Sequence, residues 1–222
     1  MEATTNKRKK VTKILKSWSP IFIVIILGLS FFAVYKFSFD SGQLFVANHI
    51  REKVSIVANL YSPEIQSKMK EYFPEKMNYT ELFTWQSTKM NYSQNRDYHT
   101  DPLEILDYGK GACLEYAVVY VASCLVNDIP ARLLGSGYVI PGQVDHAWAE
   151  VNPSRDGKTW IHIEPADCAV SIQNGKSVAE LKCFNNPSMH YNKHIELVLA
   201  FEPTPDGGVI IRDRTEYYSP NQ

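Results

Sequence analysis

The sequence predicts an α+β fold in which a central buried helix packs on an antiparallel β-sheet, preceded by a single N-terminal transmembrane helix. Three observations lead to this prediction. Residues 112–126 are apolar nearly all round, which is typical of a helix buried in a core. Beyond them, short β-branched and aromatic runs alternate with turns that contain proline and glycine. Ahead of both, a long apolar run follows a basic leader.

The apolar run from Trp18 to Tyr35 contains no charged residue. As a helix it would measure ~27 Å, close to the thickness of the hydrocarbon core of a membrane. Trp18 and Tyr35 stand at its two ends, where aromatic belts form. We therefore expect a transmembrane helix over 18–36. The alternative is a cleaved signal peptide, but the apolar region of such peptides is usually shorter, and no Ala-x-Ala-like site follows the run.

The charge distribution predicts the orientation of this helix across the membrane. The whole chain has a net charge of −1, but residues 1–19 hold six basic residues and one acidic residue, which is +5 and leaves −6 for the remainder. Positive charge stays on the cytoplasmic side. We therefore expect 1–17 to be a basic cytoplasmic tail of a single-pass protein of the cell membrane. Because the basic excess is confined to this tail, no nucleic-acid partner is expected.

Apolar residues at helical spacing, followed by Pro63 and Pro74, predict a helical stalk or accessory hairpin over 37–80. The main domain is expected over 81–216, with a short tail at 217–222. Asp101 and Pro102 mark a helix start, as N-cap and first helical residue. Strands are expected in four stretches: 131–140, 146–151, 159–164 and 194–202.

Three residues of this domain suggest nucleophilic chemistry. Cys113 stands at the start of the buried helix, where backbone N–H groups and the helix dipole favour a thiolate. His146 could take the thiol proton, and Glu164, at a strand end, could orient the imidazole. Each residue could instead have a purely structural role: Cys113 as a core cysteine, His146 as a hydrogen-bonded histidine at a sheet edge, and Glu164 as a solvated acid at a turn. Asp167 is the rival carboxylate.

The other cysteines suggest structural roles. Cys168 and Cys183 enclose a loop of about 15 residues, and a disulfide between them could persist outside the membrane. Two unpaired thiols remain the alternative, because sequence does not give their separation. Cys124 reads as a core residue. No cysteine pair has the C-x₂-C spacing of a zinc site, so we expect neither a metal nor a cofactor.

Five patches of the main domain together resemble the transglutaminase-like superfamily, the circularly rearranged relatives of papain. They are Asp101-Pro-Leu-Glu, Gly111-Ala-Cys-Leu-Glu-Tyr-Ala, Ile129-Pro-Ala-Arg, His146-Ala-Trp-Ala-Glu-Val and Trp160-Ile-His-Ile-Glu-Pro. The resemblance implies a papain-like core with Cys113 as nucleophile, His146 as base and Glu164 as acid, where the family usually has aspartate. In family members a tryptophan upstream of the cysteine can support the oxyanion, a role that would fall to Trp85. The alternative is that Trp85 is a packed aromatic residue without a role in catalysis.

The C-terminal strands resemble peptide:N-glycanase, although the zinc-binding cysteine pairs typical of that enzyme are absent. Together these features predict an extracytoplasmic thiol enzyme that cleaves or transfers amide bonds of a protein, peptide or glycopeptide through a Cys113 acyl-thioester. Hydrolysis is favoured over crosslinking, because nothing indicates the calcium sites and flanking β-domains of crosslinking relatives. The alternative is a non-catalytic transglutaminase-like module for binding or assembly at the membrane.

The predicted orientation can be tested on intact cells. Because the basic residues precede the apolar run, residues 40–222 should lie outside and be digested by added protease. Lysed cells provide the control for complete digestion. Full protection until lysis, with the protein in the membrane fraction, would reverse the orientation.

Overall fold

The structure of the protein, a computed structural model, describes residues 29–32, 36, 46–94, 97–136, 146–176, 183–190 and 197–220. Residues 46–222 form one compact unit and residues 1–45 another. Most of the predicted transmembrane span, 18–36, lies outside the described residues. Within the described part of the chain, no helix combines the length and the apolar character needed to cross a membrane.

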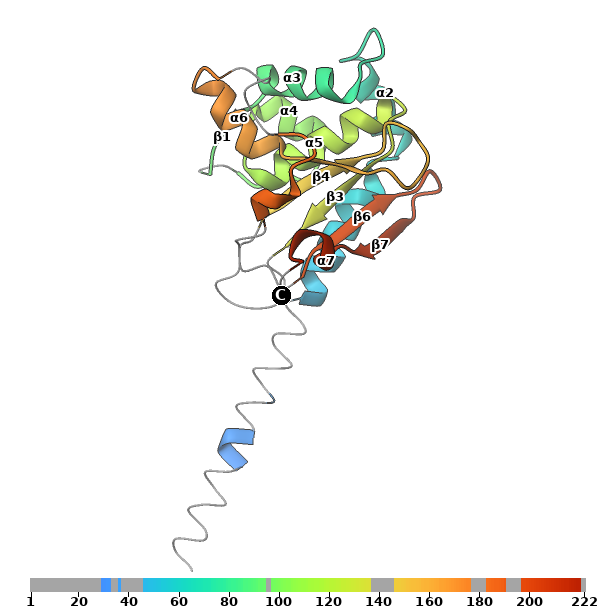
Figure 1. Cartoon of the computed structure of the whole chain (residues 1–222). Coiled ribbons are helices and arrows are strands. Elements are labelled where there is room, and N and C mark those ends of the chain that lie inside the picture. The colour runs from blue at the N-terminus through green and yellow to red at the C-terminus, as the bar shows by residue number, and fades with distance from the viewer. Residues whose placement is uncertain are drawn as a thin grey trace, which may run out of the picture. The chain divides into compact units, whose positions relative to one another are not determined.

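A five-stranded sheet organises the larger unit, in the order β5-β4-β3-β6-β7 (Figure 1). All neighbouring strands are antiparallel. The strands are β3 (Ala131–Gly135), β4 (Ala147–Val151), β5 (Ile161–Ile163), β6 (Leu199–Pro203) and β7 (Val209–Asp213). The mixed fold with an antiparallel sheet is thus confirmed. The strands are shorter than expected: β3 ends at Gly135, residues 137–145 are not described, and β6 begins only at Leu199.

The central helix is α5 (Cys113–Val126), which packs on β3 and β4 (Figure 1). Every residue from 114 to 126 is buried, as the apolar sequence predicts. Because side chains alternate along a strand, the sheet buries both of its faces. Leu133 and Ala149 join the core that contains α5, whereas Leu134 and Trp148 join a second cluster.

The helices that precede α5 belong to the same core, including those of the stretch 37–80, for which a helical stalk or accessory hairpin is expected. Residues 46–59 are helical, and Val57 is fully buried in the core. The next helices are α2 (Pro63–Lys70), α3 (Tyr79–Lys89) and α4 (Pro102–Tyr108), and each of them contacts α5. The expected boundary at residue 81 falls inside α3. The physical reason is that the apolar faces of these helices find no other surface to cover them.

Local signals explain where α4 begins and ends. The Asp101 carboxylate accepts a hydrogen bond from the N–H of Leu103 at 2.8 Å, which makes it the N-cap, as expected. Gly109 ends the helix with φ of 68°, in the left-handed region that favours glycine. The chain then forms a short parallel pair of strands, β1 (Asn91–Tyr92) and β2 (Lys110–Gly111), which leads directly into α5.

The C-terminal part adds three short helical elements. They are α6 (Pro165–Gln173), the 3₁₀ helix η2 (Pro187–His190) and α7 (Thr215–Tyr218). The expected tail at 217–222 begins inside α7, and Tyr218 is fully buried against Trp148. Its buried ring therefore packs with the rest of the domain.

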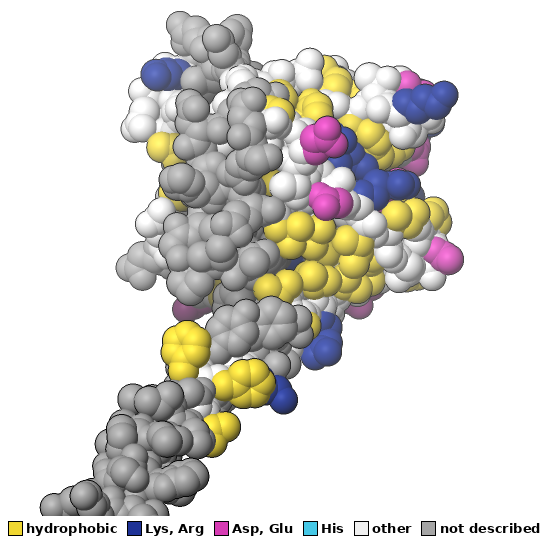
Figure 2. All heavy atoms as spheres, turned by 60° about the horizontal axis from the view of Figure 1, so that its bottom comes forward, with side chains coloured by type: hydrophobic (Ala, Val, Ile, Leu, Met, Phe, Trp, Pro, Cys, Tyr) yellow, Lys and Arg dark blue, Asp and Glu magenta, His cyan; other side chains and the backbone are white. Residues whose placement is uncertain are grey.

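The sheet edge formed by β7 remains exposed. Ile210 and Ile211 are 40% and 43% exposed, and Arg212 next to them pairs with Glu202 at 3.2 Å. On the face drawn in Figure 2, hydrophobic side chains gather among basic and acidic ones. Charged residues on an edge strand discourage pairing with other chains.

A disulfide joins Cys168 in α6 to Cys183, with their Cα atoms 5.9 Å apart. Replacing both cysteines by alanine should lower the free energy of unfolding by about 3 kcal/mol, the value the chain-entropy model gives for a loop of this length. Denaturant unfolding at neutral pH would measure the loss. Reductant should destabilise the native chain by the same amount and leave the double variant unaffected. Equal stability of all samples would contradict the role of this bond.

Candidate active site

Cys113 is the first residue of α5, and its side chain is half-buried while its neighbours are buried. The helix start is closed by Glu115, whose carboxylate accepts a hydrogen bond from the N–H of Ala112 at 3.1 Å. Gly111 makes this possible, because a Cβ at that position would come within 2.5 Å of the Cβ of Glu115. The glycine therefore leaves room for the capping acid, and the helix N-terminus points its backbone N–H groups toward Cys113.

His146 lies directly before β4, beside the N-terminus of α5. Its Nε2 lies 3.0 Å from Oε2 of Glu164, and the ring also hydrogen-bonds with Cys113. Since Glu164 occupies Nε2, Nδ1 is the nitrogen left for the thiol. The ring stacks on Trp148 with 5.6 Å between centroids. Pairing of β3 with β4 ends beside it, where Ser136 donates its N–H to the His146 carbonyl.

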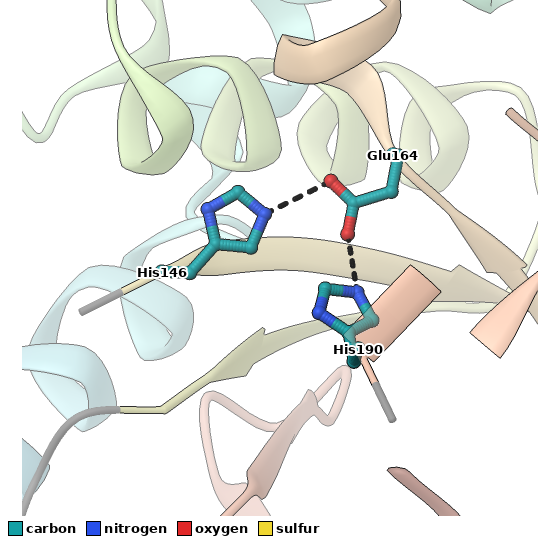
Figure 3. A group of neighbouring side chains, drawn as sticks. All are labelled: His146, Glu164 and His190. Carbon is teal, nitrogen blue, oxygen red and sulfur yellow. Dashed lines mark hydrogen bonds and ion pairs between the residues drawn. The ribbon is translucent and has the colours of Figure 1, made fainter. Parts of the chain in front are cut away.

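Glu164 joins β5 to α6 and is fully buried. Its two carboxylate oxygens have different partners: in Figure 3 one oxygen faces His146 and the other faces His190. Oε2 faces His146, while Oε1 lies 2.6 Å from Nε2 of His190 and 3.3 Å from Nε2 of His162. The structure therefore brings Cys113, His146 and Glu164 into one hydrogen-bonded chain. Asp167, the rival acid, is exposed in the first turn of α6.

The electrostatics of this chain are those of a buried ion pair. Burial alone would lower the pKa of His146, but the charge of Glu164 and hydrogen bonds with Cys113 and Glu164 raise it to about 10. Burial alone would raise the pKa of Glu164. The charge of His146 and hydrogen bonds from His146, His162 and His190 instead hold it well below its usual range. The imidazolium and the carboxylate are therefore the forms present at neutral pH.

This pair links stability to pH from both sides. The raised pKa of His146 means that its contribution is complete below the ordinary value of 6.5 and is lost as the pH rises through about 10. The depressed pKa of Glu164 means that its contribution is complete above the ordinary value of 4.5 and is lost as the pH falls further. The pair therefore stabilises the folded state most between these ordinary values.

Trp85 lies in α3, where its ring packs against Phe73 and Tyr72 with centroid distances of 4.6 and 6.0 Å. This is the packed-aromatic arrangement. Among the described contacts, none joins Trp85 to His146 or Glu164. Cys124 is fully buried in α5, and burial raises the pKa of its thiol, so it remains an inert core residue.

Sequence reasoning missed His162 and His190 as partners of Glu164. The signal for His162 was present, because residues 162 and 164 are two apart in a predicted strand and so share a face. His190 follows Glu164 by 26 residues, beyond the disulfide, and no local pattern connects the two.

The histidines and Glu164 also form a potential metal-binding group. His146, Glu164 and His190 each offer one ligand atom, and these atoms lie within 4.8 Å of one another. Imidazole and carboxylate are ligands that zinc accepts. In the structure these atoms are engaged in hydrogen bonds, with Nε2 of His146 and Nε2 of His190 each bound to one oxygen of Glu164.

Comparison with known proteins places this geometry in a family. The model of the transglutaminase-like superfamily matches residues 61–165, which contain Cys113, His146 and Glu164. A peptide-N(4)-(N-acetyl-beta-glucosaminyl)asparagine amidase from Drosophila melanogaster is 26% identical over 106 residues, which cover 46% of this chain and 14% of the fly protein.

Among solved structures, two crystal structures of Rad4-Rad23 are similar in fold. One is bound to a 6-4 photoproduct UV lesion and the other is crosslinked to undamaged DNA, and each gives a TM-score of 0.50. They are 15% and 14% identical to this chain, and the similarity covers 80% of it and 48% of each compared chain. The chain thus spans about half of those structures and a small part of the fly enzyme. Residues 61–165, which contain the site itself, thus match the transglutaminase-like superfamily.

Proposed function

We propose that this protein is a membrane-anchored, extracytoplasmic thiol enzyme that cleaves or transfers amide bonds through an acyl-thioester on Cys113. The observation that supports it most is the continuous hydrogen-bonded chain from Cys113 through His146 to Glu164. A thiol becomes a nucleophile as the thiolate, and a charged imidazole beside it favours that form. The match to the transglutaminase-like superfamily supports the same reaction class.

In this mechanism the Cys113 sulfur attacks the carbonyl carbon of the amide, and the C=O electron pair moves onto oxygen. The backbone N–H of Cys113, at the free N-terminus of α5, is placed to donate to that oxyanion. His146 then gives its proton to the leaving amine as the C–N bond breaks, which leaves the acyl group on sulfur. Glu164 holds the imidazole in orientation throughout.

The thioester is resolved by a second nucleophile. Water attacks the acyl carbon while His146 takes its proton, and the C–S bond breaks to give a carboxylic acid and restore the Cys113 thiolate beside the His146 imidazolium. An amine in place of water would give transfer. We favour hydrolysis, as the sequence carries no sign of the calcium sites of crosslinking relatives.

The substrate proposed is a peptide or glycopeptide amide. Its support is the similarity to the fly asparagine amidase, whose name gives a glycosylated asparagine as substrate. Location outside the membrane is supported by the basic leader ahead of the apolar run. The disulfide agrees with it, because such bonds persist in oxidising compartments. A non-catalytic module remains the competing function, but it gives no reason to keep a buried imidazole–carboxylate pair beside a thiol.

The role of Cys113 can be tested by labelling and by turnover. Iodoacetamide at neutral pH should modify Cys113 much faster than an ordinary thiol, and Cys113→Ala should abolish both labelling and turnover of peptide or glycopeptide amides. A loss of roughly 10⁶ is the order found when a catalytic nucleophile is removed, and His146→Ala should cost nearly as much because the residues act as a unit. Cys124→Ala is the matched control and should keep full reactivity. Unchanged turnover in Cys113→Ala would rule out the proposed enzymatic function through Cys113.

The acid can be tested by two substitutions that separate charge from length. Glu164→Gln keeps the reach but loses the charge that supports the imidazolium, so turnover should fall by ~10⁴. Glu164→Asp keeps the charge but is one methylene shorter, so it should retain more activity than Glu164→Gln and less than the native chain. Measurements of kcat and KM for the three proteins give the order. Equal activity in all three would remove Glu164 from the mechanism and make Asp167 the next candidate.

A further inference from the structure

We infer that His190 is a positioning residue of this site: with His162, it holds the carboxylate of Glu164 in the orientation that His146 requires. This inference rests on the proposed function, since it concerns the same catalytic chain. His190 does not contact Cys113 in any described interaction, so its effect would pass through Glu164.

The length of Glu164 creates the need for such a residue. Where the family usually has aspartate, glutamate has one more rotatable bond, and its carboxylate can turn away from the imidazole. In the structure that rotation is blocked at both oxygens. Oε2 is bound to His146 at 3.0 Å, and Oε1 is bound to His190 at 2.6 Å and approached by His162 at 3.3 Å.

The tautomer of His190 follows from its surroundings. In the described structure, Nδ1 of His190 and Nδ1 of His162 are buried and have no hydrogen-bond partner. A buried N–H without an acceptor is costly, so the proton of His190 belongs on Nε2, where it donates to Oε1 of Glu164 at 2.6 Å. Nε2 of His162 lies 3.3 Å from the same oxygen and 3.2 Å from Nε2 of His190. Burial lowers the pKa of His190, and the charge of His146 lowers it further, although the hydrogen bond and charge of Glu164 act in the opposite direction, so this ring is neutral at neutral pH.

The fold holds His190 firmly in place. Its ring stacks on Trp148 with 4.4 Å between centroids, and Tyr218 packs against it edge-on. The segment that carries it, 183–190, is tied to the strand of the acid at several points. A disulfide joins Cys183 to Cys168, and the carbonyl of Cys183 accepts a hydrogen bond from the N–H of Glu164 at 3.1 Å. The N–H of Asn185 donates to the carbonyl of His162 at 2.7 Å. The chain after the disulfide therefore returns an imidazole to the same carboxylate.

The variants for the test separate the donor from the ring. His190→Phe keeps an aromatic ring on Trp148 and removes the donor, whereas His190→Gln restores a neutral N–H donor. Tyr218→Phe is the matched control, because it alters the same cluster and loses only the hydroxyl that bonds Glu150 at 2.8 Å. Thermal unfolding confirms that each variant is folded. The readout is the rate of Cys113 labelling by iodoacetamide across a range of pH, which needs no knowledge of the substrate.

We expect His190→Phe to label about tenfold more slowly at neutral pH, because the loss of one charge-assisted hydrogen bond has this order of effect. Its acid limb should move to higher pH by about one unit, since a carboxylate with fewer donors is protonated more readily. His190→Gln should recover most of both changes, and Tyr218→Phe should match the native chain.

Three results would overturn the inference while leaving the proposed function intact. One is a pH profile of Cys113 labelling in His190→Phe that equals the profile of the native chain. Another is an equal loss in Tyr218→Phe, which would reduce His190 to packing. The third is inhibition of native labelling by a chelator that has no effect on His190→Phe, which would make His190 a metal ligand. If native Cys113 reacts only as fast as an ordinary thiol, the proposed function itself fails, and this inference with it.

Discussion

The ion pair between His146 and Glu164 is the interaction on which the rest of this site depends. Both groups are buried, and a buried charge is stable only when it is paired and its remaining hydrogen-bonding positions are filled. Around the Glu164 carboxylate the pair has the Nε2 atoms of three imidazoles, those of His146, His190 and His162, within 3.3 Å. It also requires that α5, β4 and β5 meet at one point, which is what the antiparallel sheet and its central helix provide.

A second buried carboxylate lies close by on the same sheet. Glu150 pairs across strands with His162, so the two side chains share a face. Arg132 and Arg214 neutralise Glu150, and Tyr218 donates its hydroxyl to it while its ring packs against His190. A continuous polar and aromatic layer thus connects Glu164 to the C-terminal helix α7. This layer explains why the last residues of the chain are part of the domain.

The part of the chain that matches the transglutaminase-like superfamily has one altered residue in its site. Glutamate in place of the usual aspartate lengthens the acid, and the structure surrounds it with histidines that an aspartate would not reach in the same way. The disulfide lies next to this arrangement, between the helix that follows Glu164 and the segment that carries His190. A covalent tie at this place limits how far the segment can move away from the acid. The longer acid at position 164 and the histidine supplied by the distant segment 183–190 are therefore parts of one arrangement.

The sequence alone determined the parts of this protein that local chemistry governs. Asp101 and Gly109 set the ends of α4, the apolar run set the buried helix α5, and short alternating runs set an antiparallel sheet. The order of Cys113, His146 and Glu164 indicated one site, because each stood at the end of a predicted element, where side chains can converge.

Tertiary structure decided what depends on contacts between distant segments. The helices of 46–70 join the core that contains α5, because their apolar side chains are buried there. Trp85 packs against Tyr72 and Phe73, so its surroundings depend on how α3 packs against the segment that follows α2. His190 reaches Glu164 only because the chain after Cys183 folds back beside β5, and no pattern within a short stretch of sequence encodes that return. Periodicity and capping act over a few residues, whereas the surroundings of a buried carboxylate are assembled from the whole domain.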